Sequence, residues 1–255
     1  MAASRIMGSS DSYTFLARHY NAMTGYPDRI DAITASIGPW VSEYGIRTAL
    51  DAGCGGGALL FALRKCGVSP VGLDLSEPML RLTLENVRAR GERFPLHGAP
   101  FRSAHVIYPG HFDAVFAMGN ALVGHEDDER MEDSLRGLLG SLRLGGLLLA
   151  QMLNLTPFFL GLRRLVSHRV VDGTHYWRYA VPDADGLLFS LVVAGPKDSF
   201  ELHTSRWKRW DHFRMRERLE NAGFTGIHVY GDLTRKPFDE RRSTDLVIAA
   251  CRPNP

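Results

Sequence analysis

The sequence predicts an α/β fold with a mostly parallel sheet, an antiparallel last strand and an antiparallel β insertion. Residues 48–65 read as a short apolar strand, a glycine-dense turn and a helix, which is one repeating unit of such a sheet. Strand-like and helix-like runs then alternate to about residue 154. From about residue 166 the apolar residues follow a strand period and Asp-Gly pairs mark turns, which predicts the antiparallel insertion.

The composition is that of one globular domain with insertions, or of one and a half domains. The chain has 255 residues, 45% of them hydrophobic, and a formal net charge of +2. This balance gives no electrostatic reason to expect a nucleic acid partner, and no apolar run is long enough to span a membrane. The start of the chain lacks the apolar core of a signal peptide. Cys54, Cys66 and Cys251 have neither disulfide nor zinc spacing, so we expect no metal and a reducing, cytoplasmic location, and leave a homo-oligomer open.

The N-terminal part predicts helices. Residues 1–10 are expected to be disordered, and residues 12–22 read as a short aromatic helix. A second helix is expected over residues 27–44, where apolar side chains recur at helical spacing. Gly38-Pro39 is expected to bend or interrupt that helix, because proline removes one backbone donor and crowds the preceding turn.

The glycine-dense turn follows the strand Thr48-Ala49-Leu50-Asp51-Ala52 and reads Gly53-Cys54-Gly55-Gly56-Gly57. Glycine admits positive φ and lets a ligand approach where a Cβ would collide. The next helix presents free N–H groups at its start, so we expect an adenosine-bearing cofactor. Gly53, Gly55 and Ala58 fit the loose dinucleotide pattern, which is a weak signal alone. Asp51 opposes a dinucleotide, because a carboxylate there repels a pyrophosphate and suits an ammonium.

A second strand is expected at residues 71–75 and carries Asp74, 23 residues after Asp51. An acid at this place is positioned to accept both hydroxyls of a ribose. Ser76 is the expected N-cap of the following helix, with Pro78 in its first turn. The alternative for Asp74 is an ordinary solvated acid at a strand end.

The remaining elements continue the alternation. Residues 111–120 read as a strand whose end meets the cofactor at the switch point of the sheet. Gly145-Gly146 is expected to turn a helix into the next strand, and Gly223 to end a helix as its C′ residue. The expected helices are 58–66, 77–90, 127–143 and 213–222, and the expected later strands are 144–150, 187–194, 200–210, 224–230 and 244–250.

The pattern D-x-G-x-G-x-G at residues 51–57 resembles the class I S-adenosylmethionine-dependent methyltransferases. Their cofactor has an ammonium, a sulfonium and no phosphate, and their Rossmann-like sheet ends in an antiparallel pair. Phe112-Asp113-Ala114-Val115 and Met118-Gly119-Asn120-Ala121 resemble the glycine N-methyltransferase-like small-molecule group, over about residues 20–154. The resemblance implies four segments: a helical cap 1–46, a cofactor-binding core 47–165, a substrate lid 166–210 and a completing unit 211–255.

The resemblance also implies site residues. Arg29 would pair with the methionine carboxylate of the cofactor, as its planar fork suits, although a solvated helix position is the alternative. Met79 would pack on the adenine, and Tyr20 would reach the methionine group or the acceptor, or only pack its helix. The full set of implied cofactor contacts is Arg29, Asp51, Gly53, Gly55, Gly57, Asp74, Leu75, Met79, Pro100, Phe101, Met118, Gly119 and Asn120.

Two departures from the family pattern affect the expected ligands. No acid occurs between Arg93 and Phe112 to bind the adenine amino group, so Pro100 and Phe101 stacking would have to serve. The glycine enzymes also carry an arginine after the fifth strand, where this chain has Leu153 or a neighbour. Because a buried carboxylate without a cation is costly, glycine is an unlikely acceptor and a less acidic amine or hydroxyl is preferred.

The expected activity is methyl transfer to a small molecule, an amine first, by in-line displacement. Positioning alone supplies on the order of 7–11 kcal/mol in favourable cases. The expected catalytic residues are Asn120, Tyr20 and His125, the last as the base of an O-methylation variant or merely exposed. The alternatives are an O- or C-methyltransferase, a nicotinamide-dependent oxidoreductase, or a cofactor-binding regulatory protein without turnover.

Overall fold

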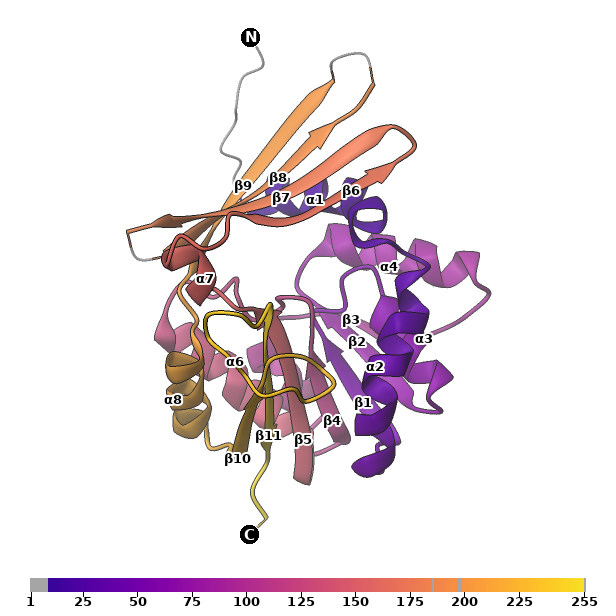
Figure 1. Ribbon diagram of the computed structural model, residues 1–255. Coiled ribbons are helices and arrows are strands. Elements are labelled where there is room, and N and C mark those ends of the chain that lie inside the picture. Colours follow the sequence, from indigo (N-terminus) through magenta and orange to yellow (C-terminus); the bar gives the residue numbers. More distant parts are fainter. Residues whose placement is uncertain (1–8, 185, 197–198, 255) are drawn as a thin grey trace.

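The structure, a computed structural model, describes residues 9–184, 186–196 and 199–254, which form a seven-stranded and a four-stranded sheet with flanking helices (Figure 1). Of the expected disordered stretch, residues 1–8 lie outside the described residues. The first helix, α1 (Ser9–Thr24), begins earlier than expected, so the prediction for residues 9 and 10 is wrong. None of the helices described is long and apolar enough to cross a membrane.

The large sheet has the strand order β10-β11-β5-β4-β1-β2-β3. Strands β1 to β5 pair in parallel, and β11 is antiparallel to both β5 and β10. This confirms the mostly parallel sheet with an antiparallel last strand. The chain runs outward from β1 to β3 and returns to β4 beside β1, so the order reverses between β1 and β4 and creates a ligand-binding crevice there. The bounds are β1 (Thr48–Ala52), β2 (Ser69–Asp74), β3 (Leu96–Gly98), β4 (Phe112–Ala117), β5 (Leu142–Leu153), β10 (Thr225–Tyr230) and β11 (Asp245–Cys251).

Helices cover both faces of the large sheet. Because strand side chains alternate between faces, Ala114 and Phe116 of β4 belong to one buried cluster, whereas Val115 and Ala117 belong to the other. The first cluster includes side chains of α2 (Arg29–Glu43), α3 (Ala58–Lys65) and α4 (Glu77–Ala89). The second includes side chains of α5 (Ala104–Ile107), α6 (Asp128–Ser141) and α8 (His212–Ala222).

The four-stranded sheet is fully antiparallel, in the order β6-β7-β8-β9, as the insertion was expected to be. Its strands are β6 (Leu165–Val171), β7 (Thr174–Asp183), β8 (Gly186–Ala194) and β9 (Phe200–Lys208), and α7 (Thr156–Phe159) precedes them. The first Asp-Gly turn is confirmed, with Asp172 and Gly173 at φ 48° and 73°; Asp185 of the second lies outside the described residues.

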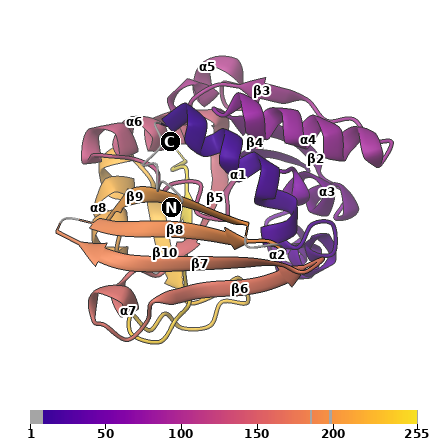
Figure 2. The same ribbon diagram turned by 90° about the horizontal axis from the view of Figure 1, so that it is seen from above.

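The small sheet lies across one end of the large sheet, and Figure 2 looks down on its four strands and on α1. Helix α1 packs against it, because Phe15 and Met23 join Tyr176, Leu191 and Val193 in one buried cluster. The N-terminal helix and the insertion therefore form one cover.

One local expectation is wrong, and the interruption expected at Gly38-Pro39 is absent. Helix α6 ends at Ser141 and β5 starts at Leu142, so Gly145-Gly146 lies inside the strand. Gly145 has φ +71°, and the register with β4 shifts in this stretch, which is how a bulge uses glycine. Helix α2 continues through Pro39, because its buried face, including Trp40, holds the helix despite the lost backbone bond.

Candidate functional site

A cavity of about 1210 Å³ lies between the carboxyl ends of the large sheet and the small sheet. It exceeds the about 300–1,000 Å³ of a typical single-ligand site, so two small molecules fit side by side. Most of the site residues expected from the sequence line it. These are Tyr20, Arg29, Gly53, Gly55, Asp74, Leu75, Met79, Pro100, Phe101, Gly119, Asn120 and His125.

Three expected residues do not line this cavity. Asp51 is only 2% exposed and lies beneath its surface. Gly57 is the N-cap of α3, where its φ of +81° starts the helix. Met118 packs against the buried cluster under α2 and α3. Met118 directly follows β4 and continues its alternation, since Phe116 packs in the same cluster and Ala117 in the other.

The glycine turn has the conformation that only glycine adopts freely. Gly53 and Gly55 have φ of +83° and +54°. A Cβ at Gly53 would lie 2.7 Å from the Cβ of Ala121, and one at Gly55 would lie 2.9 Å from the hydroxyl oxygen of Tyr20. The turn thus brings bare backbone to the cavity beside Tyr20.

Asp74 ends β2 and binds the glycine turn. Its Oδ2 accepts the N–H of Gly55 at 2.9 Å, and its Oδ1 accepts the N–H of Ser76 at 2.9 Å. The backbone N–H of Leu75 also bonds Asp74, and a carboxylate has about four lone-pair sites, so capacity remains for a hydroxyl donor. Burial raises the pKa of Asp74, while the N–H groups of Ser76 and Gly55 lower it. Ser76 caps α4 as expected, accepting the N–H of Met79 at 3.3 Å.

The carbonyl groups of the glycine turn are held by α4, which the sequence reasoning did not find. The hydroxyl of Thr83 donates to the carbonyl of Gly55, and the amide of Asn86 donates to that of Gly56 at 2.8 Å. Asn21 of α1 donates to Asn86 Oδ1 at 2.8 Å. The available signal was a pair of polar residues three apart on the buried face of the helix that follows Asp74.

Asp51 and Arg29 lie near each other and near Tyr20. Burial raises the pKa of Asp51 to about 8, the negative charge of Asp74 adds to the rise, and Arg29 opposes it. Asp51 Oδ2 is buried without a hydrogen-bond partner among the described residues. Burial also raises the pKa of Tyr20, again against the charge of Arg29. An orphaned carboxylate oxygen near an arginine fits the ammonium and carboxylate of an amino-acid group.

The opposite end of the turn is apolar. Leu75 lines the cavity and is 71% exposed, which is unusual for a leucine, and Met79 is 3% exposed in the same wall. Pro100 and Phe101 line the cavity from the short helix η1 (Phe101–Ser103) and the residue before it. A flat ring can stack on these apolar side chains. This suits an adenine whose amino group has no acidic side chain to bind it.

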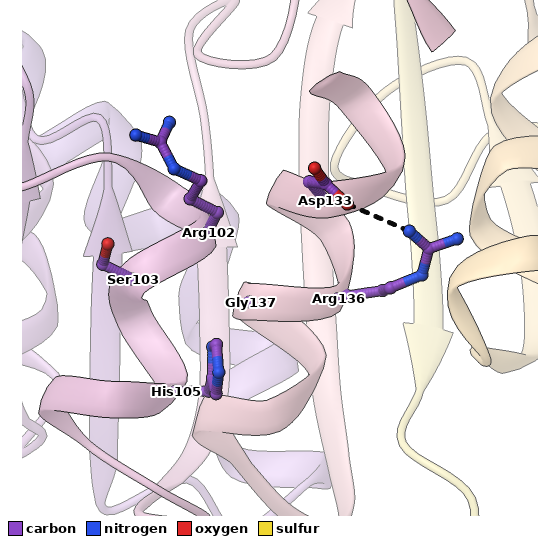
Figure 3. A pocket seen from close by; sticks show the side chains of 6 residues that line it. All are labelled: Arg102, Ser103, His105, Asp133, Arg136 and Gly137. Carbon is purple, nitrogen blue, oxygen red and sulfur yellow. Dashed lines mark hydrogen bonds and ion pairs between the residues drawn. The ribbon is translucent and has the colours of Figure 1, made fainter. Parts of the chain in front are cut away.

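Figure 3 shows a second pocket, lined by residues of η1, α5 and α6. A separate depression of about 470 Å³ lies between η1, α5 and α6. There Asp133 and Arg136 form an ion pair at 3.0 Å. Gly137 allows α6 to approach η1, since a Cβ at Gly137 would lie 2.3 Å from the carbonyl oxygen of Phe101. The depression is therefore a packing seam behind the cavity wall.

The switch point carries a polar network. Asn120 has φ 74°, which asparagine tolerates, and its Oδ1 accepts the N–H of Leu153 at 2.7 Å. Gln151 Oε1 accepts the N–H of Gly119 at 2.9 Å, and the Gln151 side chain also bonds Asp245. Burial raises the pKa of Asp245, which lines the cavity. Asp245 begins β11, and the sequence reasoning did not find it.

His125 lines the cavity, and both of its ring nitrogens are hydrogen-bonded within the protein. Its Nδ1 lies 2.9 Å from the carbonyl oxygen of Leu122, and its Nε2 lies 2.7 Å from Ser134 Oγ. Burial lowers its pKa, so the ring is neutral, with Nδ1–H donating and Nε2 accepting. The ring is half-buried rather than simply exposed.

The small sheet supplies the far wall. Phe189 and Trp207 stack with ring centroids 4.1 Å apart and both line the cavity. Of the Trp207-Lys208-Arg209-Trp210 segment, only Trp207 lines it. Arg178 of β7 also lines the wall, and its Nε donates to Ser167 Oγ at 2.6 Å.

Known methyltransferases share the central part of this chain. The family described as Methyltransferase domain matches residues 49–146. The cypemycin N-terminal methyltransferase of a Streptomyces species is 33% identical over 222 residues, which are 84% of this chain and 88% of that protein. The ubiquinone biosynthesis O-methyltransferase of Methylococcus capsulatus is 39% identical over only 72 residues, which are 28% of this chain and 30% of that protein.

The whole fold is similar to solved methyltransferase structures. CcbJ methyltransferase from Streptomyces caelestis has a TM-score of 0.78 and 20% identity, over 97% of this chain and 100% of that one. An S-adenosylmethionine-dependent methyltransferase from Clostridium acetobutylicum has a TM-score of 0.76 and 14% identity, over 95% and 99%. At these identities the likeness concerns the fold, insertion included.

Proposed function

The chain belongs to the class I S-adenosylmethionine-dependent methyltransferases, and we propose that it methylates the nitrogen of a small-molecule amine. When bound, the cofactor supplies a sulfonium methyl group open to in-line displacement. Alignment of the two reactants can supply up to about 7–11 kcal/mol. A nitrogen acceptor is supported by the name of the 33% identical relative, an N-terminal methyltransferase. The motifs at Phe112 and Gly119 support a place near the glycine N-methyltransferase-like group.

Five side chains are proposed to hold the cofactor. Asp74 accepts the ribose hydroxyls beside its bonds to the backbone. Arg29 binds the methionine carboxylate, and Asp51, which is not part of the cavity wall, takes the ammonium directly or through a water. Leu75 packs on the adenine opposite Phe101. Because the glycine turn is already bonded to Asp74, little ordering is required on binding.

Asp245 is the observation that carries the amine proposal. An amine arrives as an ammonium at neutral pH and must lose a proton before its lone pair can attack. Asp245 lines the cavity beside Gln151, and its raised pKa suits a carboxylate that holds an ammonium and then keeps its proton. Gln151 accepts the N–H of Gly119, the residue before Asn120. Asn120 orients the acceptor with its side-chain amide.

His125 is not proposed as the base of an O-methylation. Both of its ring nitrogens are hydrogen-bonded within the protein, to Leu122 and Ser134. Tyr20 then serves as wall rather than base, because its raised pKa keeps the phenol protonated. O- and C-methylation remain the alternatives, and the 39% identical segment belongs to an O-methyltransferase.

We assign the segments accordingly. Residues 1–46 and 166–210 cover the cofactor and select the acceptor, residues 47–165 hold the cofactor, and residues 211–255 complete the sheet and contribute Asp245. A cytoplasmic location is supported by Cys54, Cys66 and Cys251, which are all free thiols.

A labelled-methyl transfer experiment tests the function. The protein is incubated with S-adenosylmethionine carrying a deuterated methyl group and with panels of amines, phenols and carboxylates. We expect the label on nitrogen of at least one amine, by mass spectrometry, with loss of transfer in Asp245→Asn. Label found only on oxygen or carbon contradicts the amine proposal.

A further inference from the structure

Arg178 is a charged side chain on the wall of the cavity that faces the cofactor-binding strands. It lies on β7, across from Ser167 of β6 and Leu191 of β8. Leu191 is buried and also lines the cavity, so this row of the small sheet faces inward. The Ser167 hydroxyl fixes Arg178 Nε at 2.6 Å, which leaves the terminal guanidinium nitrogens for a ligand.

The charge of Arg178 has no partner among the described carboxylates. Five arginines line the cavity. Arg130 pairs with Glu126, Arg206 pairs with Asp183, and Arg102 is exposed to solvent at the rim. Arg29 and Arg178 are half-buried and form no ion pair in the described part of the chain. Holding a partly desolvated cation without an anion is costly, so a bound anion is expected beside each.

The two unpaired arginines are close enough to affect each other. Burial lowers the pKa of Arg178, and the positive charge of Arg29 lowers it further. In the proposed cofactor complex, Arg29 is satisfied by the methionine carboxylate and Asp51 by the ammonium. The sulfonium then adds a positive charge, and Arg178 still has no ion-pair partner in the described part of the chain. An anionic group of the other molecule in the cavity would supply that partner.

We propose that Arg178 binds a carboxylate of the methyl acceptor, so that the substrate class is an amine that also carries a carboxylate, such as an amino acid or a peptide. This rests on the proposed amine methylation at the same site. The planar guanidinium fork matches a carboxylate through two parallel bonds. Asp245 receives the amine and Arg178 the carboxylate, and the two residues lie on different sheets that line one cavity.

This inference changes the expected acceptor. The absence of an arginine at Leu153 argued against an acidic substrate, and Leu153 does line the cavity without a cation beside it in sequence. Arg178 supplies the cation from the insertion, 25 residues further along the chain. A search confined to the segment after the fifth strand cannot find it.

Binding to the full chain saturated with S-adenosylhomocysteine tests the proposal without requiring turnover. Calorimetry compares amino acids of increasing amine-to-carboxylate spacing and dipeptides, each with its C-terminal carboxamide. We expect at least one carboxylate to bind about tenfold or more tightly than its carboxamide. Arg178→Met should remove that preference, Arg178→Lys should keep part of it, and Arg216→Met, an exposed arginine on α8, should leave it intact.

Three outcomes overturn the proposal. The first is that no carboxylate binds better than its carboxamide. The second is that Arg178→Met weakens S-adenosylhomocysteine itself as much as Arg29→Met does, which would assign Arg178 to the cofactor carboxylate. The third is tighter binding of aminophosphonates than of the matching carboxylates. The same comparison with hydroxy acids and their amides distinguishes failure of this proposal from failure of the proposed amine methylation. If Arg178 binds a carboxylate but the protein methylates no amine, hydroxy acids should still bind more tightly than their amides.

Discussion

Asp74 accepts the backbone N–H of Gly55 at 2.9 Å, so the acid that ends β2 also holds the glycine turn that follows β1. One carboxylate thus links the two strand ends between which the cofactor is expected to lie. Thr83 and Asn86 hold the same turn from α4 through its carbonyl groups. These bonds hold the turn in one conformation, which lowers the entropic cost of binding a ligand there.

Replacing Asp74 should weaken binding of the cofactor. Asp74→Ala removes the proposed acceptor of two ribose hydroxyls, and we expect a loss of about 1–3 kcal/mol in the binding free energy of S-adenosylhomocysteine. Calorimetry measures it. Asp74→Asn retains one acceptor oxygen and should lose less, and Asp31→Ala, an exposed acid on α2, should lose nothing. Unchanged affinity in Asp74→Ala would remove this residue from the site.

The pH dependence of cofactor binding should report the protonation of Asp51. Burial raises the pKa of Asp51 to about 8, so the free protein holds a proton there at neutral pH. The cofactor's ammonium favours the carboxylate, so binding releases that proton and affinity should rise with pH until about 8. Calorimetry in buffers of different ionisation enthalpy counts the protons released. Asp51→Asn should abolish both the slope and the release.

The same group should affect stability in the free protein. An unfolded aspartate loses its proton near its ordinary range, whereas folded Asp51 keeps it to about 8. Between these values the folded state binds more protons, so the free energy of unfolding should fall as pH rises. Urea unfolding across this range measures the effect. If the slope is the same in Asp51→Asn as in the original chain, the pKa of Asp51 is not raised.

Local sequence patterns indicated residues that the structure brings together at the ends of β1 and β2. Asp51, the glycine turn and Asp74 fall within two consecutive strand ends, so neighbouring residues in sequence become neighbours in space. Ser76 was likewise readable, because an N-cap depends on the three residues after it. Met118 directly follows β4, packs against the buried cluster under α2 and α3, and does not line the cavity, so its predicted cofactor contact stays a prediction.

The residues proposed to bind the methyl acceptor could not be predicted from the sequence, because they come together only in the folded sheet. Asp245 reaches Gln151 by the antiparallel pairing of β11 with β5, across 94 residues of chain. Arg178 reaches the cavity only because the insertion folds back over the large sheet. Neither residue carries a local motif, and the direction of each side chain depends on strand register.

The support of the glycine turn can be tested through Thr83. Thr83→Val keeps the shape of the side chain and removes the hydroxyl that donates to the buried carbonyl of Gly55. We expect a loss of about 1–3 kcal/mol in unfolding free energy and weaker binding of S-adenosylhomocysteine. Thr34→Val removes a comparable hydroxyl, bonded to the Ile30 carbonyl within α2, and should leave cofactor affinity unchanged. Equal affinities in both variants would contradict a role for Thr83 in shaping the turn.

Substitutions of Asp245 and of His125 should lower kcat to different extents. With an amine acceptor, Asp245→Asn should lower kcat by about 10²–10⁴-fold because the proton acceptor is lost. His125→Asn should lower it by less than about tenfold, because both ring nitrogens are already bonded within the protein. Neither change should alter S-adenosylhomocysteine affinity, which serves as the internal control. The reverse order of effects would assign the base to His125.

A crystal structure of the full chain with S-adenosylhomocysteine most directly tests the placement of the cofactor. We expect the nucleoside across the carboxyl ends of β1 and β2, with both ribose hydroxyls on Asp74 and the amino-acid carboxylate on Arg29. Density for the ligand away from Asp74, or an empty crevice at saturating ligand, would contradict it.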